Sequence, residues 1–148
     1  MSRFAYPDEL IRRVLASSRV VAMVGASPRP GRPSHGVMCV LQQKGHKVYP
    51  VNPTCAGATI HGETVLAGLA EVPEPIDMVD IFRRSDRAGA AVDDAIAARA
   101  KTVWMQLDVV DEEAASRAEA AGLTVIMDRC PVIEYRRLGA PGPGTRNK

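Results

Sequence analysis

The chain has 148 residues, of which 46% are hydrophobic and 24% are charged. This length suits one domain with a substantial core, and the composition is that of a globular rather than a disordered protein. A formal net charge of +2 argues against a nucleic-acid surface, and no apolar run approaches the roughly 20 residues that cross a bilayer. We therefore expect a cytoplasmic protein that has no nucleic-acid or membrane partner.

Neither a disulfide framework nor a metal centre is expected. The three cysteines, Cys39, Cys55 and Cys130, are odd in number and lack the C-x-x-C spacing of zinc sites. The acidic run at Asp111, Glu112 and Glu113 is typical of a solvated helix start, where carboxylates favour the positive end of the helix dipole.

The first predicted elements are a helix, a strand and a second helix. The helix covers Asp8–Ser17, because its apolar residues recur on one helical face. The apolar run over Arg19–Met23, which continues into Val24, predicts a buried parallel strand. A second helix is expected from Ser34, which can cap it, to Gly45, which can adopt the left-handed stop.

Four more strands and two more helices follow. The strands are predicted at Lys47–Asn52, Asp77–Phe82, Thr102–Leu107 and Leu123–Met127. The helices are expected from Ser85 to Ala100 and from Asp111 to Gly122. Alternation of this kind predicts an α/β fold, a doubly wound parallel five-stranded sheet with helices on both faces. We place this one domain at residues 1–138 and expect a flexible tail at 139–148, where proline and glycine are frequent.

The loop VGASPRPGRPSH, residues 24–35, follows the first strand. Ligands of doubly wound sheets bind at this position, beyond the carboxyl ends of the strands. A helix that begins after a glycine loop presents unpaired N–H groups and a partial positive charge, both of which favour phosphate. Gly25 permits close approach to the backbone, and the loop adds hydroxyl and guanidinium donors: Ser27, Arg29, Arg32 and Ser34. A solvated loop explains each residue alone, but together they predict a phosphate ligand.

The sequence also narrows the choice of nucleotide. A dinucleotide fingerprint reads G-x-G-x-x-G, and only Gly25 fits it. An NAD site needs an acid near the end of the second strand, which here reads Pro50-Val51-Asn52-Pro53. NAD is therefore disfavoured. NADP stays open, as does a nucleotide that carries an extra phosphate without a nicotinamide.

Five ordered blocks resemble the small bacterial CoA-binding proteins, over about residues 19–138. They are VGASP with RPS at 24–28 and 32–34, YPVNP at 49–53, DMVDIFR at 77–83, VWMQL at 103–107 and MDRCP at 127–131. That family is similar to the amino-terminal CoA-binding domain of the succinyl-CoA synthetase alpha subunit. The resemblance implies a Rossmann-like fold with coenzyme A, or an acyl-CoA, lying across the strand tips.

The resemblance also implies which residues contact CoA. Those expected at the phosphates are Gly25, Ala26, Ser27, Arg32 and Ser34. Asn52 and Pro53 would border the adenosine, Phe82 and Arg83 would line the next section, and Gln106 would complete the rim. Two positions depart from the family pattern: Thr54 stands where a lysine is frequent, and Asp108 where glycine is common.

The residues favour binding over catalysis. The synthetases that the chain resembles use a phosphorylated histidine in a second domain, and we expect no counterpart of that domain in this chain. His46 and His61 are expected to be structural or exposed, and a Ser34–His35 pair lacks an orienting acid. We expect a non-catalytic sensor, carrier or docking module, whose partner is a second copy or an acyl-CoA enzyme. The alternatives are an NADP-binding oxidoreductase component and a detached CoA-binding subunit of an acyl-CoA ligase.

Cys130 follows the fifth predicted strand and is therefore expected near the ligand-binding edge. Two interpretations stay open. The side chain is a small buried apolar group, as free cysteines usually are, or it is a thiol that forms a mixed disulfide with the thiol of CoA.

Overall fold

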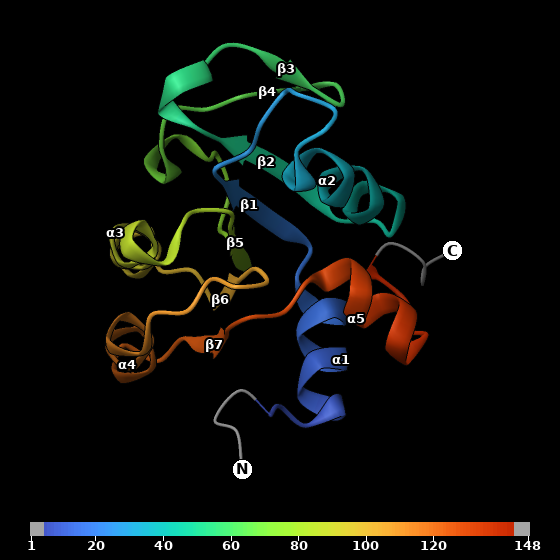
Figure 1. Ribbon diagram of the computed structural model, residues 1–148, viewed down its shortest axis with the longest axis vertical. Helices are drawn as coiled ribbons and strands as arrows, with labels where there is room; N and C mark the ends of the chain where they lie inside the picture. Colours follow the sequence, from blue (N-terminus) through green and yellow to red (C-terminus); the bar gives the residue numbers. More distant parts are fainter. Residues whose placement is uncertain (1–4, 144–148) are drawn as a thin grey trace.

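A parallel β-sheet lies between two layers of helices in the computed structural model, which describes residues 5–143 (Figure 1). The five parallel strands follow the order β2-β1-β5-β6-β7. Their bounds are Val20–Val24 (β1), Lys47–Val51 (β2), Met78–Ile81 (β5), Thr102–Met105 (β6) and Thr124–Ile126 (β7). The predicted α/β fold, Rossmann-like and doubly wound, is confirmed.

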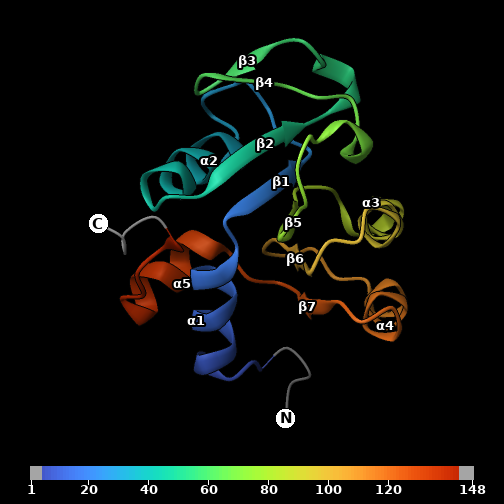
Figure 2. The same cartoon turned by 180° about the vertical axis from the view of Figure 1, so that it is seen from behind.

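Helices cover both faces of the sheet (Figures 1 and 2). One face carries α1 (Asp8–Ser17), α2 (Pro33–Gln43) and α5 (Pro131–Leu138). The other face carries α3 (Ser85–Ala97) and α4 (Glu112–Ala120). No helix within the described residues has both the length and the apolar character needed to cross a membrane.

The helices on the two faces contribute side chains of different size to the core. Large side chains, among them Leu15, Met38, Leu41 and Trp104, fill the face under α1, α2 and α5. On the other face, α3 and α4 contribute mainly alanines to the core: Ala88, Ala91, Ala95, Ala114, Ala115 and Ala118. Small side chains let these two helices lie close to the sheet and to each other, because little volume separates the backbones.

The helix α5 and a short antiparallel hairpin were not predicted from the sequence. The helix α5 starts with Pro131 at its first position and stops at Gly139, whose φ is +61°, and both are ordinary helix boundaries. A short hairpin, β3 (Thr59–Ile60) with β4 (Glu63–Thr64), follows β2. The residues of its turn, His61 and Gly62, have φ values of +48° and +84°.

A buried histidine connects the elements of the first face. Nδ1 of His46 lies 2.6 Å from the carbonyl oxygen of Ser18, and Nε2 lies 2.5 Å from the hydroxyl of Tyr135. Because a carbonyl only accepts, Nδ1 carries the proton and Nε2 accepts from the tyrosine. Burial lowers the pKa of His46, against the smaller opposite effect of the hydrogen bond to Ser18, so the ring is neutral. Its predicted structural role is confirmed.

The chain continues to pack beyond the predicted domain boundary at residue 138. Ala140 is 5% exposed and belongs to the core under α1, α2 and α5. The backbone at Gly142 lies so close to Lys44 that an added Cβ would be 2.1 Å from its carbonyl oxygen. The remainder of the predicted tail, residues 144–148, lies outside the described residues.

Candidate functional site

A cavity of about 1090 Å³ opens at the carboxyl ends of the sheet strands. Its walls come from the loop after β1, the turn after β2, the segments after β5 and β6, and the start of α5. β1 lies between β2 and β5 in the sheet, so the cavity occupies the switch point where doubly wound sheets bind ligands.

Most of the residues that the sequence predicted as contacts are gathered in this cavity. They are Gly25, Ser27, Arg32, Ser34, Asn52, Phe82, Arg83 and Gln106. Ala26 and Pro53 do not line it. Ala26 belongs to the loop after β1, but its side chain is 1% exposed and packs into the core, and Pro53 begins a short 3-10 turn, Pro53–Cys55 (η1).

Gly25 lets the loop after β1 pack closely against the segment that follows β5. Its φ is +87°, a left-handed conformation that side chains resist, and an added Cβ would lie 2.3 Å from the carbonyl oxygen of Phe82. Its N–H donates to the carbonyl of Val51 at 2.9 Å. Glycine is therefore required here by both conformation and space.

Ser34 does not cap α2, so that prediction is wrong. The helix begins one residue earlier, at Pro33, and its N-cap residue Arg32 provides no side-chain hydrogen bond. Instead, Oγ of Ser34 accepts from the N–H of Ser27 at 3.1 Å and closes the loop on itself. The helix start is thus left without a side-chain cap where it borders the cavity, which favours an anion there.

Asn52 joins the end of β2 to the loop after β1. Its Nδ2 donates to the carbonyl of Ala26 at 2.9 Å. Its Oδ1 accepts from both the N–H and the hydroxyl of Thr54, at 3.0 and 2.8 Å. The amide therefore shapes the cavity wall through contacts within the protein.

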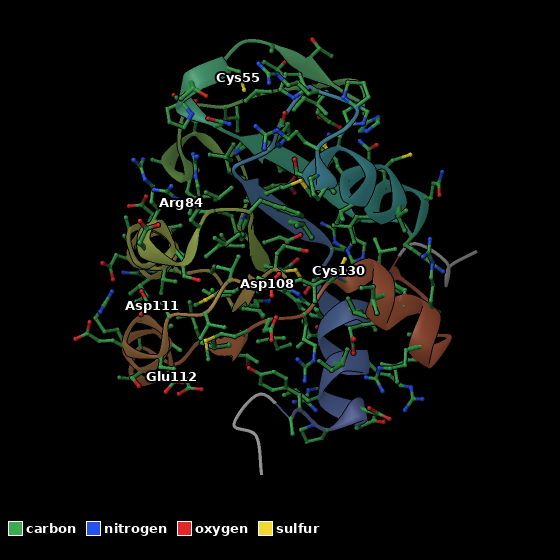
Figure 3. All side chains as sticks on the ribbon, in the orientation of Figure 1. Cys55, Arg84, Asp108, Asp111, Glu112 and Cys130 are labelled. Atoms are coloured by element: carbon green, nitrogen blue, oxygen red, sulfur yellow. The ribbon has the colours of Figure 1, made fainter. Side chains whose placement is uncertain are left out.

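The cavity has two chemically different ends. We call the first the arginine end, formed by Arg29, Arg32, Arg83 and Arg84. Arg84 pairs with Asp86 at 3.3 Å, whereas the other three form no ion pair with the residues that the structure describes. We call the second the glutamine end, formed by residues 106–109 after β6 and by Cys130. It contains no cation, and its charged side chain is that of Asp108; Figure 3 labels Asp108 and Cys130.

Sequence reasoning missed Asp80, a fully buried carboxylic acid behind the glutamine end. Nε2 of Gln106 donates to Oδ1 of Asp80 at 3.1 Å, while Oδ2 has no partner among the described residues. Burial raises the pKa of Asp80 to about 7, although the hydrogen bond from Gln106 lowers it in part. The available signal was an acid inside the apolar strand 77–82.

Cys130 lines the cavity and is 8% exposed. Burial raises the pKa of its thiol, against the backbone N–H groups of Ile133 and Val132, which lower it. The thiol is therefore protonated at neutral pH, which agrees with a small buried group and slows any exchange that needs the thiolate.

Comparison with known families matches residues 19–136 to the CoA binding domain. The chain belongs to this CoA-binding family. The predicted resemblance is thus confirmed. The uncharacterized protein YneT of Bacillus subtilis (strain 168) is 38% identical over 125 residues, which cover 84% of this chain and 91% of that protein.

Solved structures extend the comparison. A hypothetical protein from Pyrococcus horikoshii OT3 has a TM-score of 0.88 at 34% identity, over 95% of this chain and 97% of that one. An acetyl-coenzyme A synthetase 1 from Ca. Korarchaeum cryptofilum has a TM-score of 0.67 at 28% identity, over 78% of this chain and 26% of that one. The family fold thus occurs as a small protein and as one part of a larger synthetase.

The departure from the CoA-binding family pattern at Asp108 has a conformational basis. Its φ is +67°, the left-handed region where glycine is favoured and aspartate is among the better tolerated alternatives. Its N–H donates to Oδ1 of Asp128 at 2.7 Å, and its carbonyl accepts from the hydroxyl of Ser85 at 3.2 Å. These contacts hold the segment after β6 in place.

The histidines lie outside this site. His46 is buried between α1 and α5, and His61 bonds through Nε2 to the carbonyl of His35 at 2.8 Å. None of the three lines the cavity. Residues 5–143 contain no group of three or more histidine, cysteine or acidic side chains arranged to hold a metal ion.

Proposed function

We propose that the chain binds coenzyme A or an acyl-CoA, with the phosphates at the arginine end and the pantetheine arm at the glutamine end. The observation that carries this proposal is the division of one cavity into a part with four arginines and a part without cations. CoA has the same division, because its charges sit on the phosphorylated ADP moiety and its arm carries only amides, a hydroxyl and a thiol. Charge complementarity then sets the direction of the ligand.

The loop after β1 acts as the phosphate-binding loop in this proposal. Gly25 brings backbone close to the ligand, and the uncapped start of α2 adds its partial positive charge. Arg32 supplies a planar guanidinium that can bind two phosphate oxygens. Because Thr54 provides no cation, the arginines carry the charge on their own.

We propose further that the protein holds its ligand as a sensor, carrier or docking module. The cavity lining described above includes no histidine, and the cysteine thiol at the glutamine end is protonated at neutral pH. Incubation with acetyl-CoA is expected to release no free thiol above the rate in buffer. Release that depends on enzyme concentration would instead indicate a thioesterase or transferase activity.

The test of binding is a thermal-shift series on ligand-stripped protein with CoA, acetyl-CoA, desulfo-CoA, NAD and NADP at equal concentrations. A ligand that binds only the folded state raises its apparent stability by mass action. We expect an increase in Tm with the three CoA compounds and none with NAD or NADP. A shift with NADP alone would overturn the proposal in favour of an oxidoreductase component.

A further inference from the structure

The pairing of Asp80 with Gln106 determines which atom the glutamine presents to the cavity. The two residues lie on the same face of neighbouring strands, because Asp80 is opposite Trp104 in the parallel register and Gln106 is two residues further along. Asp80 is 0% exposed and Gln106 is 7% exposed, so the contact between them is shielded from water.

Above its pKa of about 7, Asp80 is ionised, and an ionised carboxylate can only accept hydrogen bonds. It therefore selects the amide nitrogen of Gln106, which donates to Oδ1 at 3.1 Å. The carbonyl oxygen Oε1 must then point away from Asp80. A glutamine without such a partner could present either its oxygen or its nitrogen, because the two ends of the amide have nearly the same shape.

The oxygen Oε1 of Gln106 is accessible from the cavity. It accepts no hydrogen bond from the described residues. Among those residues, Oδ2 of Asp80 is the only side-chain oxygen or nitrogen that is both buried and without a partner, so Oε1 of Gln106 is not buried. Since Gln106 lines the cavity, its Oε1 faces the space at the glutamine end. This end therefore offers a hydrogen-bond acceptor.

We propose that Asp80 is a positioning residue, which fixes Gln106 so that Oε1 accepts a hydrogen bond from an amide N–H of the pantetheine arm. This inference rests on the proposed binding of CoA. It makes the glutamine end specific for a neutral ligand segment that carries N–H donors, whereas the arginine end recognises only charge. Asp80 acts without touching the ligand.

The experiment compares two ligands by calorimetric titration at a pH of about 8.5, where Asp80 is ionised. The ligands are CoA and adenosine 3′-phosphate 5′-diphosphate, which has the same charged part without the arm. In Asp80→Asn the introduced amide can accept from Gln106 or donate to it, so the selection of orientation is lost. With the two orientations of the amide about equally populated, we expect about a twofold weaker affinity for CoA and an unchanged affinity for the shorter nucleotide.

A double exchange provides the matched rescue. In D80N/Q106E the new amide donates to one carboxylate oxygen and leaves the other facing the cavity as an acceptor. Affinity for CoA is expected to return to that of the original protein. A protein that only needs Asp80 for folding would show no such recovery.

Three outcomes would overturn the inference: unchanged CoA affinity in D80N, equal weakening for both ligands, or no recovery in the double exchange. If D80N does not fold, Gln106→Leu takes its place, because this variant removes the acceptor itself and leaves Asp80 unchanged. The affinities for the same two ligands are then compared. If the original protein binds neither ligand, the proposed function fails as well, and that result is distinct from a loss confined to the variants.

Discussion

The arginine end and the glutamine end of the cavity recognise a ligand by different means. The first depends on net charge from flexible guanidinium groups and on a helix start, all within short segments after β1 and β5. The second depends on the orientation of one amide, which a residue 26 positions earlier in the chain determines through a buried hydrogen bond. The charge of the arginine end can be predicted from a local sequence motif. The orientation of the Gln106 amide can be predicted only when its partner in the folded structure is known.

The largest effect is expected on the free energy of unfolding, from Gly25→Ala in the loop that also carries two arginines of the arginine end. The new side chain would have to adopt φ of +87° and would meet the carbonyl oxygen of Phe82 at 2.3 Å. Conformation and overlap together should cost about 4 kcal/mol or more of unfolding free energy. Gly57→Ala is the matched control, because Gly57 has φ of +94° with open space around it. Urea unfolding checks both, and equal losses would contradict the steric argument.

The glutamine end is expected to control the pH dependence of stability through Asp80. Its folded pKa of about 7 lies above the unfolded value of about 4, so the folded state binds more protons between these limits. Stability is therefore lost as pH rises through this window. D80N does not titrate, and its stability relative to the original protein should improve by on the order of 2 to 4 kcal/mol between pH 4 and pH 8.

The control for this pH effect is Asp94→Asn, which makes the same chemical change on the exposed surface of α3. Unfolding free energies of both variants and the original protein, measured at matched pH, isolate the contribution of burial. A difference for D80N that stays constant from pH 4 to pH 8 would contradict the raised pKa.

A smaller effect is expected when one charge is removed from the arginine end. Arg32→Gln should weaken CoA about tenfold and reduce the dependence of affinity on salt, because a guanidinium to phosphate contact is lost. Arg13→Gln on the exposed surface of α1 removes the same charge away from the cavity and should leave affinity unchanged. Equal effects of the two variants would show that only overall charge matters.

The smallest effect is expected on the alkylation rates of the cysteines. These rates report whether the cavity is occupied by ligand, and their measurement needs no mutation. Cys130, buried and with a raised pKa, should react with iodoacetamide several-fold more slowly than Cys39 and Cys55, which are partly exposed. Saturating CoA should slow Cys130 and Cys55 further, since both line the cavity, but not Cys39. Peptide mass spectrometry over time gives the three rates. Protection of Cys39 alone would place the ligand elsewhere.

The sequence by itself determined the five strands of the parallel sheet, four of the five α-helices that the structure describes and the loop after β1. Each of these rests on a local cause that can be read along the chain: apolar runs for buried strands, amphipathic spacing for α1, and a glycine, serine and arginine loop for a phosphate. The family resemblance predicted more, because its motifs include Asn52 and Gln106, whose positions in the cavity depend on long-range contacts.

Only the tertiary structure decided what those side chains do. Ser34 closes its own loop instead of capping α2, because the N–H of Ser27 folds back within 3.1 Å of it. Asp80 became visible only when β5 and β6 paired in register, which places its carboxylate against Gln106 and away from water. The direction of a hydrogen bond and the burial of a side chain depend on residues that are distant in the chain. Which residues these are becomes known only from the pairing of the strands in the folded sheet.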